Sequence, residues 1–183
     1  LMETTSVTAR DGTKSRFRVL AEHDQSALGD FFEKLSEQTR SRFAPHPLSS
    51  EFAVQLCINL LTETTQRFVL ESDGNIVGYF ILQSEMSEHE ASRYAQQGIT
   101  LKTGDDLLFA PCIADKYQNK GFASLVMEIL INHYKARVKS FVLMGGTQAT
   151  NLAGRSFYKK FGFKESGGYQ MDVYNIDMRL RFS

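Results

Sequence analysis

The stretch that most constrains the fold runs from residue 107 to residue 135. Leu107 to Ala114 is apolar without alternation, which predicts a strand that is buried on both faces. From Gly121 to Lys135, apolar residues recur at three- and four-residue intervals, which predicts an amphipathic helix. Ser140 to Met144 then reads as a further strand. The centre of the chain is therefore predicted to be one strand–helix–strand unit.

Shorter elements are predicted on both sides of this unit. The best marked is a hairpin, in which two runs rich in apolar residues flank Ser-Asp-Gly-Asn. The predicted strands are Ser15–Leu20, Arg67–Glu71, Ile76–Gln83 and two after Phe163, and the predicted helices begin at Asp24, Ser50 and Asn151. This order predicts an α/β (α+β) fold in which about seven mostly antiparallel strands form a mixed sheet with helices on both faces.

The composition fits one soluble domain. The 183 residues are 42% hydrophobic, enough for a core, and we expect a single domain over 13–183 after a flexible N-terminus over 1–12. The 21 basic residues equal the 21 acidic ones, so nothing in the overall charge favours binding to nucleic acid. No apolar run is long enough to cross a membrane, and there is no signal-peptide pattern. We therefore expect a cytoplasmic protein that binds neither nucleic acid nor membrane.

The cysteines and histidines give no metal-ligand spacing, so no metal is expected. Cys57 and Cys112 both lie in apolar runs and do not make a disulfide framework, which favours a reducing compartment. Cys112 could be imagined as a nucleophile, but a cysteine in an apolar strand is usually a small core residue.

The turn before the central helix has the composition of an anion site. A helix N-terminus presents unpaired N–H groups, and Gly121 allows a ligand to approach the backbone closely. Ala123 is small, and Lys116 and Lys120 add positive charge. The segment lacks the Gly-Lys-Ser/Thr ending of a Walker loop and the Gly-x-Gly-x-x-Gly pattern of a dinucleotide fold. A phosphate site and an ordinary strand-to-helix turn both remain open on this pattern alone.

A later helix carries two stripes. Ala153, Phe157 and Phe161 form a core stripe at four-residue spacing. A second stripe, about 100° round the helix, joins Asn151, Gly154, Tyr158 and Gly162. Taken singly, these residues read as an N-cap, a C-cap and a surface tyrosine, but a glycine inside a helix suggests that something lies against that face.

Together the two stretches resemble the GNAT superfamily of acyl-CoA-dependent N-acyltransferases. Residues 118–123, QNKGFA, are similar to the family's pyrophosphate loop Q/R-x-x-G-x-G/A. Residues 151–163 are similar to its pattern N-x-x-A-x-x-x-Y-x-x-x-G-F, with Gly154 in place of the usual alanine. Asp115 stands where the family often has proline, which would leave the loop less rigid.

The resemblance implies an acetyltransferase that uses acetyl-CoA as its co-substrate. Backbone groups of residues 111–113 would hold the pantetheine arm, and amides of the loop would hold the pyrophosphate. The implied acetyl-CoA-binding residues are Cys112, Ile113, Gln118, Asn119, Lys120, Gly121, Phe122, Ala123, Ser124 and Asn151. Direct attack of a primary amine on the thioester, in a ternary complex, would form the product.

Two catalytic roles are expected on this basis. Tyr158 would act as general acid, since a tyrosine hydroxyl can give a proton to the leaving thiolate. The base is less clear, because some branches carry a glutamate at the position of Leu107. Asp105 is the nearest carboxylate on the same strand face and is our candidate base, with Glu85 as another.

The acceptor is expected to be a small-molecule or peptide amine, with 41–50 and 84–106 shaping its pocket; His46 could touch it. Two other functions stay open. One is a non-catalytic acyl-CoA-binding or sensing module, and the other a nucleotide-binding enzyme that uses Gly145 and Gly146. The sequence also leaves open whether the protein forms a homodimer.

Overall fold

The computed structural model describes residues 2–61 and 63–182, and the chain divides into two compact units. The first unit comprises residues up to 81 together with 111–133. The second comprises residues 82–110 together with those from 134 onward. Strands β4 (Asn75–Gln83) and β5 (Asp106–Ile113) each run from one unit into the other.

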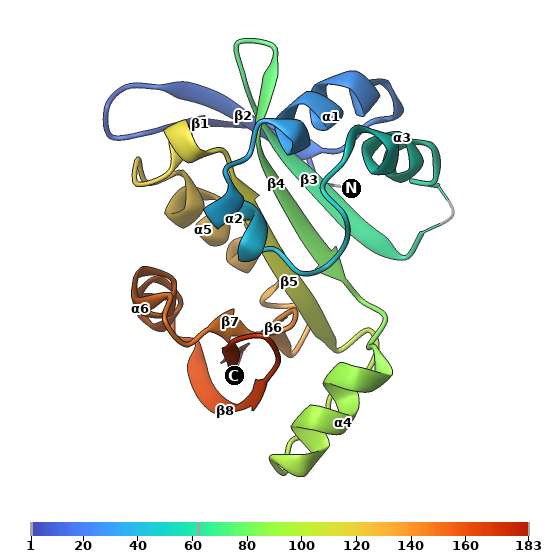
Figure 1. The fold of residues 1–183 in the computed structure, drawn as a ribbon, viewed down its shortest axis with the longest axis vertical. Helices are drawn as coiled ribbons and strands as arrows, with labels where there is room; N and C mark the ends of the chain where they lie inside the picture. Colours follow the sequence, from blue (N-terminus) through green and yellow to red (C-terminus); the bar gives the residue numbers. More distant parts are fainter. Residues whose placement is uncertain (1, 62, 183) are drawn as a thin grey trace. The chain divides into compact units, whose positions relative to one another are not determined.

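The first unit is built on a run of antiparallel strands (Figure 1). Strand β2 (Lys14–Val19) pairs with β1 (Thr5–Thr8) on one side and with β3 (Thr65–Ser72) on the other. Its helices are α1 (Gln25–Glu33), α2 (Glu37–Ser41), α3 (Ser50–Ile58) and α5 (Phe122–Tyr134). Two 3-10 turns, Glu22–Asp24 and Asp115–Tyr117, precede α1 and α5.

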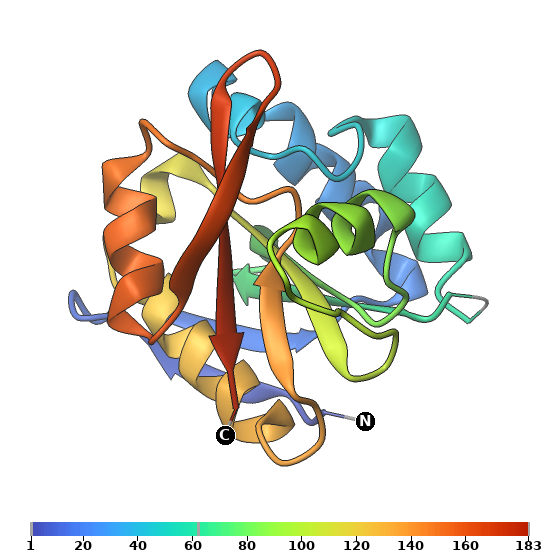
Figure 2. The same ribbon diagram turned by 90° about the horizontal axis from the view of Figure 1, so that it is seen from below.

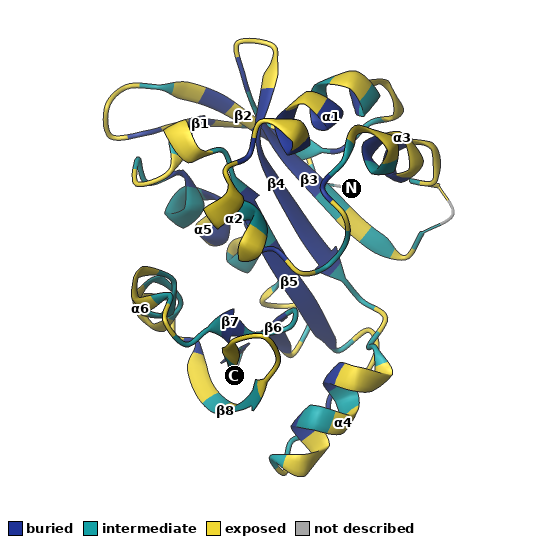
Figure 3. Cartoon of the chain, viewed as in Figure 1, coloured by how far each residue is buried: buried dark blue, intermediate teal, exposed yellow. Residues whose placement is uncertain are grey.

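Local chemistry explains the best-predicted hairpin. Between β3 and β4, Asp73 and Gly74 both have positive φ, 50° and 79°, which is the geometry of a type I′ turn. Aromatic side chains fill the core beneath these strands: the Phe17 ring stacks on Phe68 at 5.3 Å between centroids and meets Phe80 edge-on at 5.6 Å. In Figure 3, β4 is accordingly coloured as buried over most of its length.

The second unit holds the parallel part of the sheet. Strand β6 (Ser140–Leu143) pairs in parallel with β5, in the register Asp106↔Ser140, and antiparallel with β9 (Tyr174–Arg181). The short β7 (Thr147–Gln148) and the longer β8 (Lys164–Gln170) also pair with β9, and Figure 2 shows β8 and β9 as one long hairpin. The helices are α4 (Glu88–Gln96) and α6 (Leu152–Lys160).

Helix α4 is anchored by a small apolar cluster. Tyr94 and Leu101 pack with Leu108 of β5 and Val142 of β6, and all four are buried. The helix begins after Ser87, whose hydroxyl oxygen caps it by accepting a hydrogen bond from the amide of Glu90 at 3.3 Å.

The fold class is confirmed: the chain is mixed α/β with a large, mostly antiparallel open sheet. The described residues form nine strands rather than about seven. The prediction missed β1, which lies in the polar segment 1–12 that we expected to be flexible, and β7, which is only two residues long. It also missed the short helix α2, which is separated from α1 by three residues.

Within the residues that the structure describes, no helix is both long and apolar enough to cross a membrane. The same residues contain no group of three or more His, Cys, Asp and Glu side chains that could hold a metal ion.

Candidate functional site

The segment between β5 and α5 presents backbone amides that have no partner within the helix. The first hydrogen bond inside α5 runs from the amide of Leu125 to the carbonyl of Gly121 (3.1 Å), so the amides of residues 122–124 have no partner within the helix. Gly121 has φ = +91°, a conformation that side-chain-bearing residues rarely adopt, and Asn119 has φ = 62°. The positive end of the helix dipole lies at the same place, so this turn suits a phosphate group.

A cation from the N-terminal hairpin lies against this turn. The guanidinium of Arg10, between β1 and β2, donates to the carbonyl of Asn119 at 3.4 Å, and the Arg10 amide donates to the carbonyl of Lys120 at 3.4 Å. A Cβ at Gly121 would lie 3.7 Å from the Arg10 guanidinium carbon. Lys120 pairs with Asp11 at 2.9 Å. Sequence reasoning missed Arg10 because nothing local links residue 10 to residue 120.

A polar latch holds the turn to helix α2. The carboxylate of Asp115 accepts hydrogen bonds from the Ser36 amide (3.0 Å), the Ser36 hydroxyl (2.6 Å) and the Thr39 hydroxyl (2.7 Å). These bonds, led by the Ser36 hydroxyl, lower the pKa of Asp115, so its carboxylate stays charged. Gln118 completes the latch: its amide group donates to Thr39 Oγ1 (3.1 Å) and to the Ile113 carbonyl (2.9 Å).

The latch changes two sequence-based interpretations. Asp115 does not leave the loop loose, because its hydrogen bonds to α2 hold the segment that proline would have stiffened. Gln118, whose physical role could not be derived from the sequence, supports the turn through Thr39 and the end of β5.

Replacing Thr39 by valine tests the latch. Valine keeps the shape of threonine but removes the hydroxyl that both donates to Asp115 and accepts from Gln118. We expect acetyl-CoA to bind about three- to tenfold more weakly, the effect of losing one or two hydrogen bonds, while the fold stays intact. Isothermal titration of both proteins checks this. Thr65→Val on β3 is the matched control, and equal affinities of the two variants would show that the latch has no role in binding.

Alternation along β5 decides which backbone groups face which neighbour. The Phe109 carbonyl accepts from the Met144 amide (2.9 Å), and the Ala114 amide donates to Val77 of β4 (2.8 Å). In the second unit the carbonyl of Phe109 therefore faces β6, and in the first unit the amide of Ala114 faces β4. The β5–β6 register ends at Phe109↔Leu143.

Cys112 is a core residue. By the same alternation its backbone faces β4, and its side chain is only 5% exposed. Burial raises the pKa of its thiol to about 12, so the thiol keeps its proton at neutral pH. The structure therefore gives no support to a cysteine nucleophile at this position.

Asn151 caps helix α6. Its side-chain oxygen accepts a hydrogen bond from the Gly154 amide at 3.1 Å. A Cβ at Gly154 would lie 2.5 Å from the Asn151 amide nitrogen, so alanine there would displace the cap. The one departure in this motif therefore has a local reason: Gly154 leaves room for Asn151 to fold back over the first turn, where Asn151 acts as the cap.

Tyr158 is set in an aromatic cluster of the second unit. Its partly buried ring packs edge-on against Phe163 at 5.3 Å and beside Phe157 at 5.3 Å. Burial raises the pKa of its hydroxyl, so the proton is retained at neutral pH. Within 2–61 and 63–182, no side chain or backbone group hydrogen-bonds this hydroxyl, so the proton can be offered to a ligand.

Asp105 is our candidate base. It lies just before the first residue of β5 and forms a half-exposed ion pair with Lys139 at 3.0 Å. Leu107, which stands at the position of the family glutamate, is buried.

His46 lies in a cluster of aromatic rings and in a chain of hydrogen bonds. Its ring stacks on Phe52 at 4.7 Å and meets Phe32, Phe43 and Tyr79. Nδ1 lies 2.7 Å from the Pro47 carbonyl, which can only accept, so Nδ1 carries the proton. Nε2 then accepts from the Tyr79 hydroxyl (2.9 Å), whose oxygen accepts from Arg67 (2.7 Å). The residue predicted to touch the acceptor is thus partly buried, with both ring nitrogens occupied.

The partly buried His46 makes stability depend on pH. Burial is the main cause that lowers the pKa of His46 from 6.5 to about 4, so in acid the unfolded chain takes up this proton first. The contribution of neutral His46 to the free energy of unfolding is full above pH 6.5 and is lost as the pH falls toward 4. By pH 5 the free energy of unfolding should fall by about 2 kcal/mol more in the parent than in His46→Gln. Urea unfolding at pH 7.5 and 5 measures this, and parallel losses in both proteins would exclude the effect.

Comparison with known families gives one match. The profile described as "Acetyltransferase (GNAT) family" matches residues 28–163, which include the turn, the latch and the Tyr158 helix. A comparison with curated proteins finds no match.

Solved structures share the fold at low sequence identity. The GNAT domain of S. lividans PAT has a TM-score of 0.73 and 17% identity, covering 97% of this chain and 96% of that one. The ribosomal-protein-S5-alanine acetyltransferase from Vibrio fischeri has a TM-score of 0.71 and 10% identity, covering 98% and 97%. RimL, a ribosomal L7/L12 alpha-N-protein acetyltransferase in complex with coenzyme A, has a TM-score of 0.67 and 13% identity, covering 96% of each chain.

Proposed function

Because the chain belongs to the GNAT acetyltransferase family, we propose that it transfers an acetyl group from acetyl-CoA to a primary amine by direct attack in a ternary complex. The observation that carries the proposal is the turn before α5, with positive φ at Asn119 and Gly121 and free amides over 122–124. This backbone fits a pyrophosphate, because it offers several N–H donors and no side chain at its closest point.

The proposal assigns the binding groups as follows. The amides of Phe122, Ala123 and Ser124 would bind the pyrophosphate, and the cations of Lys120 and Arg10 would balance its charge. Ile113 would hold the pantetheine arm through its backbone. Gln118 and Asn119 would shape the turn, Cys112 would pack beneath the arm without reacting, and Asn151 would touch the acyl-bearing end only by leaving its cap.

Tyr158 would be the general acid. In the reaction the amine nitrogen bonds to the acetyl carbon, the carbon–sulfur bond breaks, and the sulfur leaves as a thiolate. The Tyr158 hydroxyl would give its proton to this sulfur, which its retained proton and lack of a hydrogen-bond partner among the described residues favour. Asp105, which is ion-paired with Lys139, stays the candidate base of the proposal, because Leu107 is apolar.

The acceptor would be a peptide or small-molecule amine. Two structural neighbours are named as acetyltransferases of ribosomal proteins, which supports a protein N-terminus as the first class to test. A cytoplasmic setting would suit the two free, buried cysteines, Cys57 and Cys112.

A second candidate is a non-catalytic acyl-CoA-binding module of the same fold. The observation that favours it is the apolar Leu107, buried where a catalytic carboxylate would stand. Both candidates predict acetyl-CoA binding, but only the enzyme releases free thiol.

The experiment that separates them is a thiol-release assay with acetyl-CoA and a panel of amines. The panel should hold peptides with free and blocked N-termini, a lysine side chain, a polyamine and single amino acids, and mass spectrometry should identify the acetylated product. Release of CoA only when a matching amine is present supports the enzyme. Tight acetyl-CoA binding with no acetylated product across the panel would support the binding module.

A further inference from the structure

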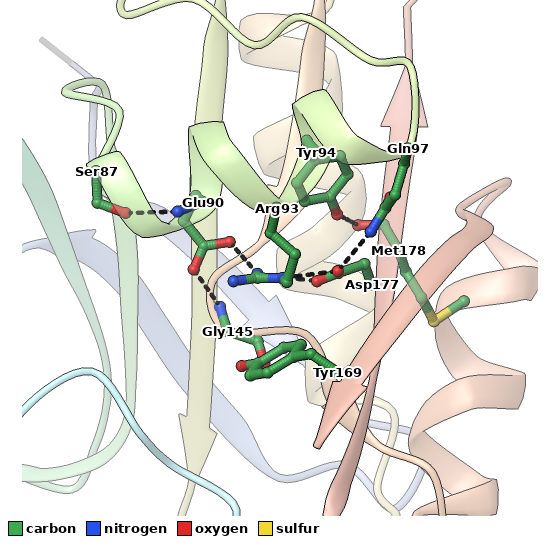
Figure 4. A network of polar contacts seen from close by, with 9 residues as sticks. All are labelled: Ser87, Glu90, Arg93, Tyr94, Gln97, Gly145, Tyr169, Asp177 and Met178. Carbon is green, nitrogen blue, oxygen red and sulfur yellow. Dashed lines mark hydrogen bonds and ion pairs between the residues drawn. The ribbon is translucent and has the colours of Figure 1, made fainter. Parts of the chain in front are cut away.

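Two polar networks of the structure lie outside the motifs that pointed to the family. In the second unit, Glu90 and Arg93 of α4 meet Asp177 of β9 (Figure 4). Arg93 donates to the fully buried Asp177 at 2.8 and 2.9 Å, and Glu90 accepts from the Gly145 amide at 3.0 Å. Because the amides of Gly145 and Gly146 are both bound within this unit, these glycines do not form a nucleotide-binding loop. This network holds α4 in the second unit through buried charges.

The second network lies in the first unit and surrounds the guanidinium of Arg40, in the last turn of α2. This group donates to three backbone carbonyls: to Leu35 at 3.1 Å, to Leu48 at 2.9 Å, and to Phe32. Phe32 and Leu35 lie at and just after the end of α1, where the carbonyls of a helix lack their usual partners. Leu48 directly precedes Ser49, the N-cap of α3. Arg40 therefore connects the end of α1 and the start of α3 through α2.

Helix α2 has little apolar packing of its own. It is five residues long, and none of its residues is buried. A helix this short is not stable by itself in water, because the first turn fixes more of the backbone than its hydrogen bonds repay. Leu35 and Phe43 are buried, but they lie outside the helix, before and after it. The place of α2 therefore depends on the polar contacts of Arg40 and of the latch.

The side chain of Arg40 is committed to the backbone. It is partly buried, and it forms no ion pair with a carboxylate in the part of the chain that the structure describes. A guanidinium presents its N–H donors as a planar fork, so it can bind carbonyls from several segments at once. Lysine offers all its donors from a single nitrogen atom and cannot reproduce this geometry.

The residue next to Arg40 carries the contact with the turn before α5. Thr39 Oγ1 donates to the Asp115 carboxylate at 2.7 Å and accepts from Gln118 at 3.1 Å. These residues all belong to the first unit. Because Thr39 and Arg40 are neighbours in one short helix, a shift of α2 that breaks the Arg40 bonds also moves the Thr39 hydroxyl. Hydrogen bonds weaken steeply when their geometry is lost, so the latch should weaken as well.

We propose that Arg40 is a positioning residue for acetyl-CoA binding: it holds α2 between α1 and α3 so that Thr39 completes the latch on the turn before α5. This inference rests on the proposed function. Arg40 does not contact acetyl-CoA in it and acts only through Thr39. Since the coupling between two sites is reciprocal, acetyl-CoA bound at the turn should in return steady α2.

Arg40→Lys tests whether Arg40 holds α2. We expect amide hydrogen exchange over 37–43 to quicken by on the order of tenfold, and acetyl-CoA to bind about three- to tenfold more weakly far below the unfolding temperature. Arg42→Lys is the matched control: it makes the same change at an exposed side chain that has no hydrogen bond or ion pair with the described residues. Equal exchange and equal affinity in the two variants would overturn the positioning role.

A double-mutant cycle separates an effect through Thr39 from a general loss of structure. If Arg40 acts through Thr39, Arg40→Lys should weaken binding by less than about twofold in a protein that already carries Thr39→Val. The same factor in both backgrounds would show that Arg40 acts independently of the latch and would overturn the proposed route. Isothermal titration of the parent, the two single variants and the double variant gives both factors.

The reciprocal effect is measured without changing Arg40. Saturating acetyl-CoA should slow amide exchange over 37–43 several-fold in the parent but not in Thr39→Val. Exchange in the parent that is unchanged by bound acetyl-CoA would contradict the coupling. A parent protein that does not bind acetyl-CoA would refute the proposed function, whereas exchange of the unliganded Arg40→Lys variant would still report whether Arg40 holds α2.

Discussion

Tyr158→Phe should lower kcat by about a hundredfold and leave the KM for acetyl-CoA nearly unchanged. A general acid contributes on the order of a hundredfold or more to a proton transfer, and phenylalanine removes only the proton donor. The ring contacts with Phe157 and Phe163 remain, so the fold should be intact. Because no described group hydrogen-bonds the hydroxyl, its loss leaves no buried partner unsatisfied.

Steady-state kinetics with a saturating amine measures the effect. Tyr174→Phe serves as the control, because it makes the same chemical change at a half-exposed position. A Tyr158→Phe enzyme with parental kcat would exclude the general-acid role. An equal rise in KM and fall in kcat, together with a lower melting temperature, would point to a structural role in α6.

Gly121→Asp should weaken acetyl-CoA binding by on the order of a hundredfold. A carboxylate at this position would lie where the phosphate is proposed to bind, repel it, and take up the free amides of α5. The same carboxylate should partly offset the backbone strain at φ = +91°, because an acidic side chain at a helix N-terminus stabilises the helix. The loss should therefore fall on binding more than on folding.

Gly104→Asp is the matched control for this variant. Gly104 has φ = +84° with open space around it, so the substitution adds the same charge at nearly the same backbone strain, away from the turn. Isothermal titration should show parental affinity in Gly104→Asp. If both variants lose affinity equally, the loss comes from general strain or charge and the phosphate assignment fails.

The sequence could predict those elements whose signal is local. The 121–135 helix repeats its apolar residues at helical spacing, and the Ser-Asp-Gly-Asn turn needs positive φ at adjacent residues, so both appear where they were expected. Strand β1 carries no such signal: it is short and polar, and it is fixed by its pairing with β2. Propensity alone gives no reason for order there.

In the candidate site, too, the sequence could predict only the residues that have a local signal. Gly121 and Tyr158 could be singled out because each stands in a recognisable pattern of neighbours. The contacts of Asp115 with Ser36 and of Arg10 with Asn119 join residues 79 and 109 positions apart, and no periodicity along the chain records them. The role of Asp105 stays a prediction, because strand alternation gives the face of a residue but not which groups lie near that end of the strand.

The central claim is that the turn before α5 binds acetyl-CoA, and its most direct test is a calorimetric titration of the parent protein with acetyl-CoA, CoA, ATP and NAD. The account predicts that acetyl-CoA and CoA bind in the micromolar range, with a Kd of roughly 1–100 µM, and that ATP and NAD bind far more weakly. Binding of ATP or NAD in the absence of any binding of acetyl-CoA or CoA would contradict it.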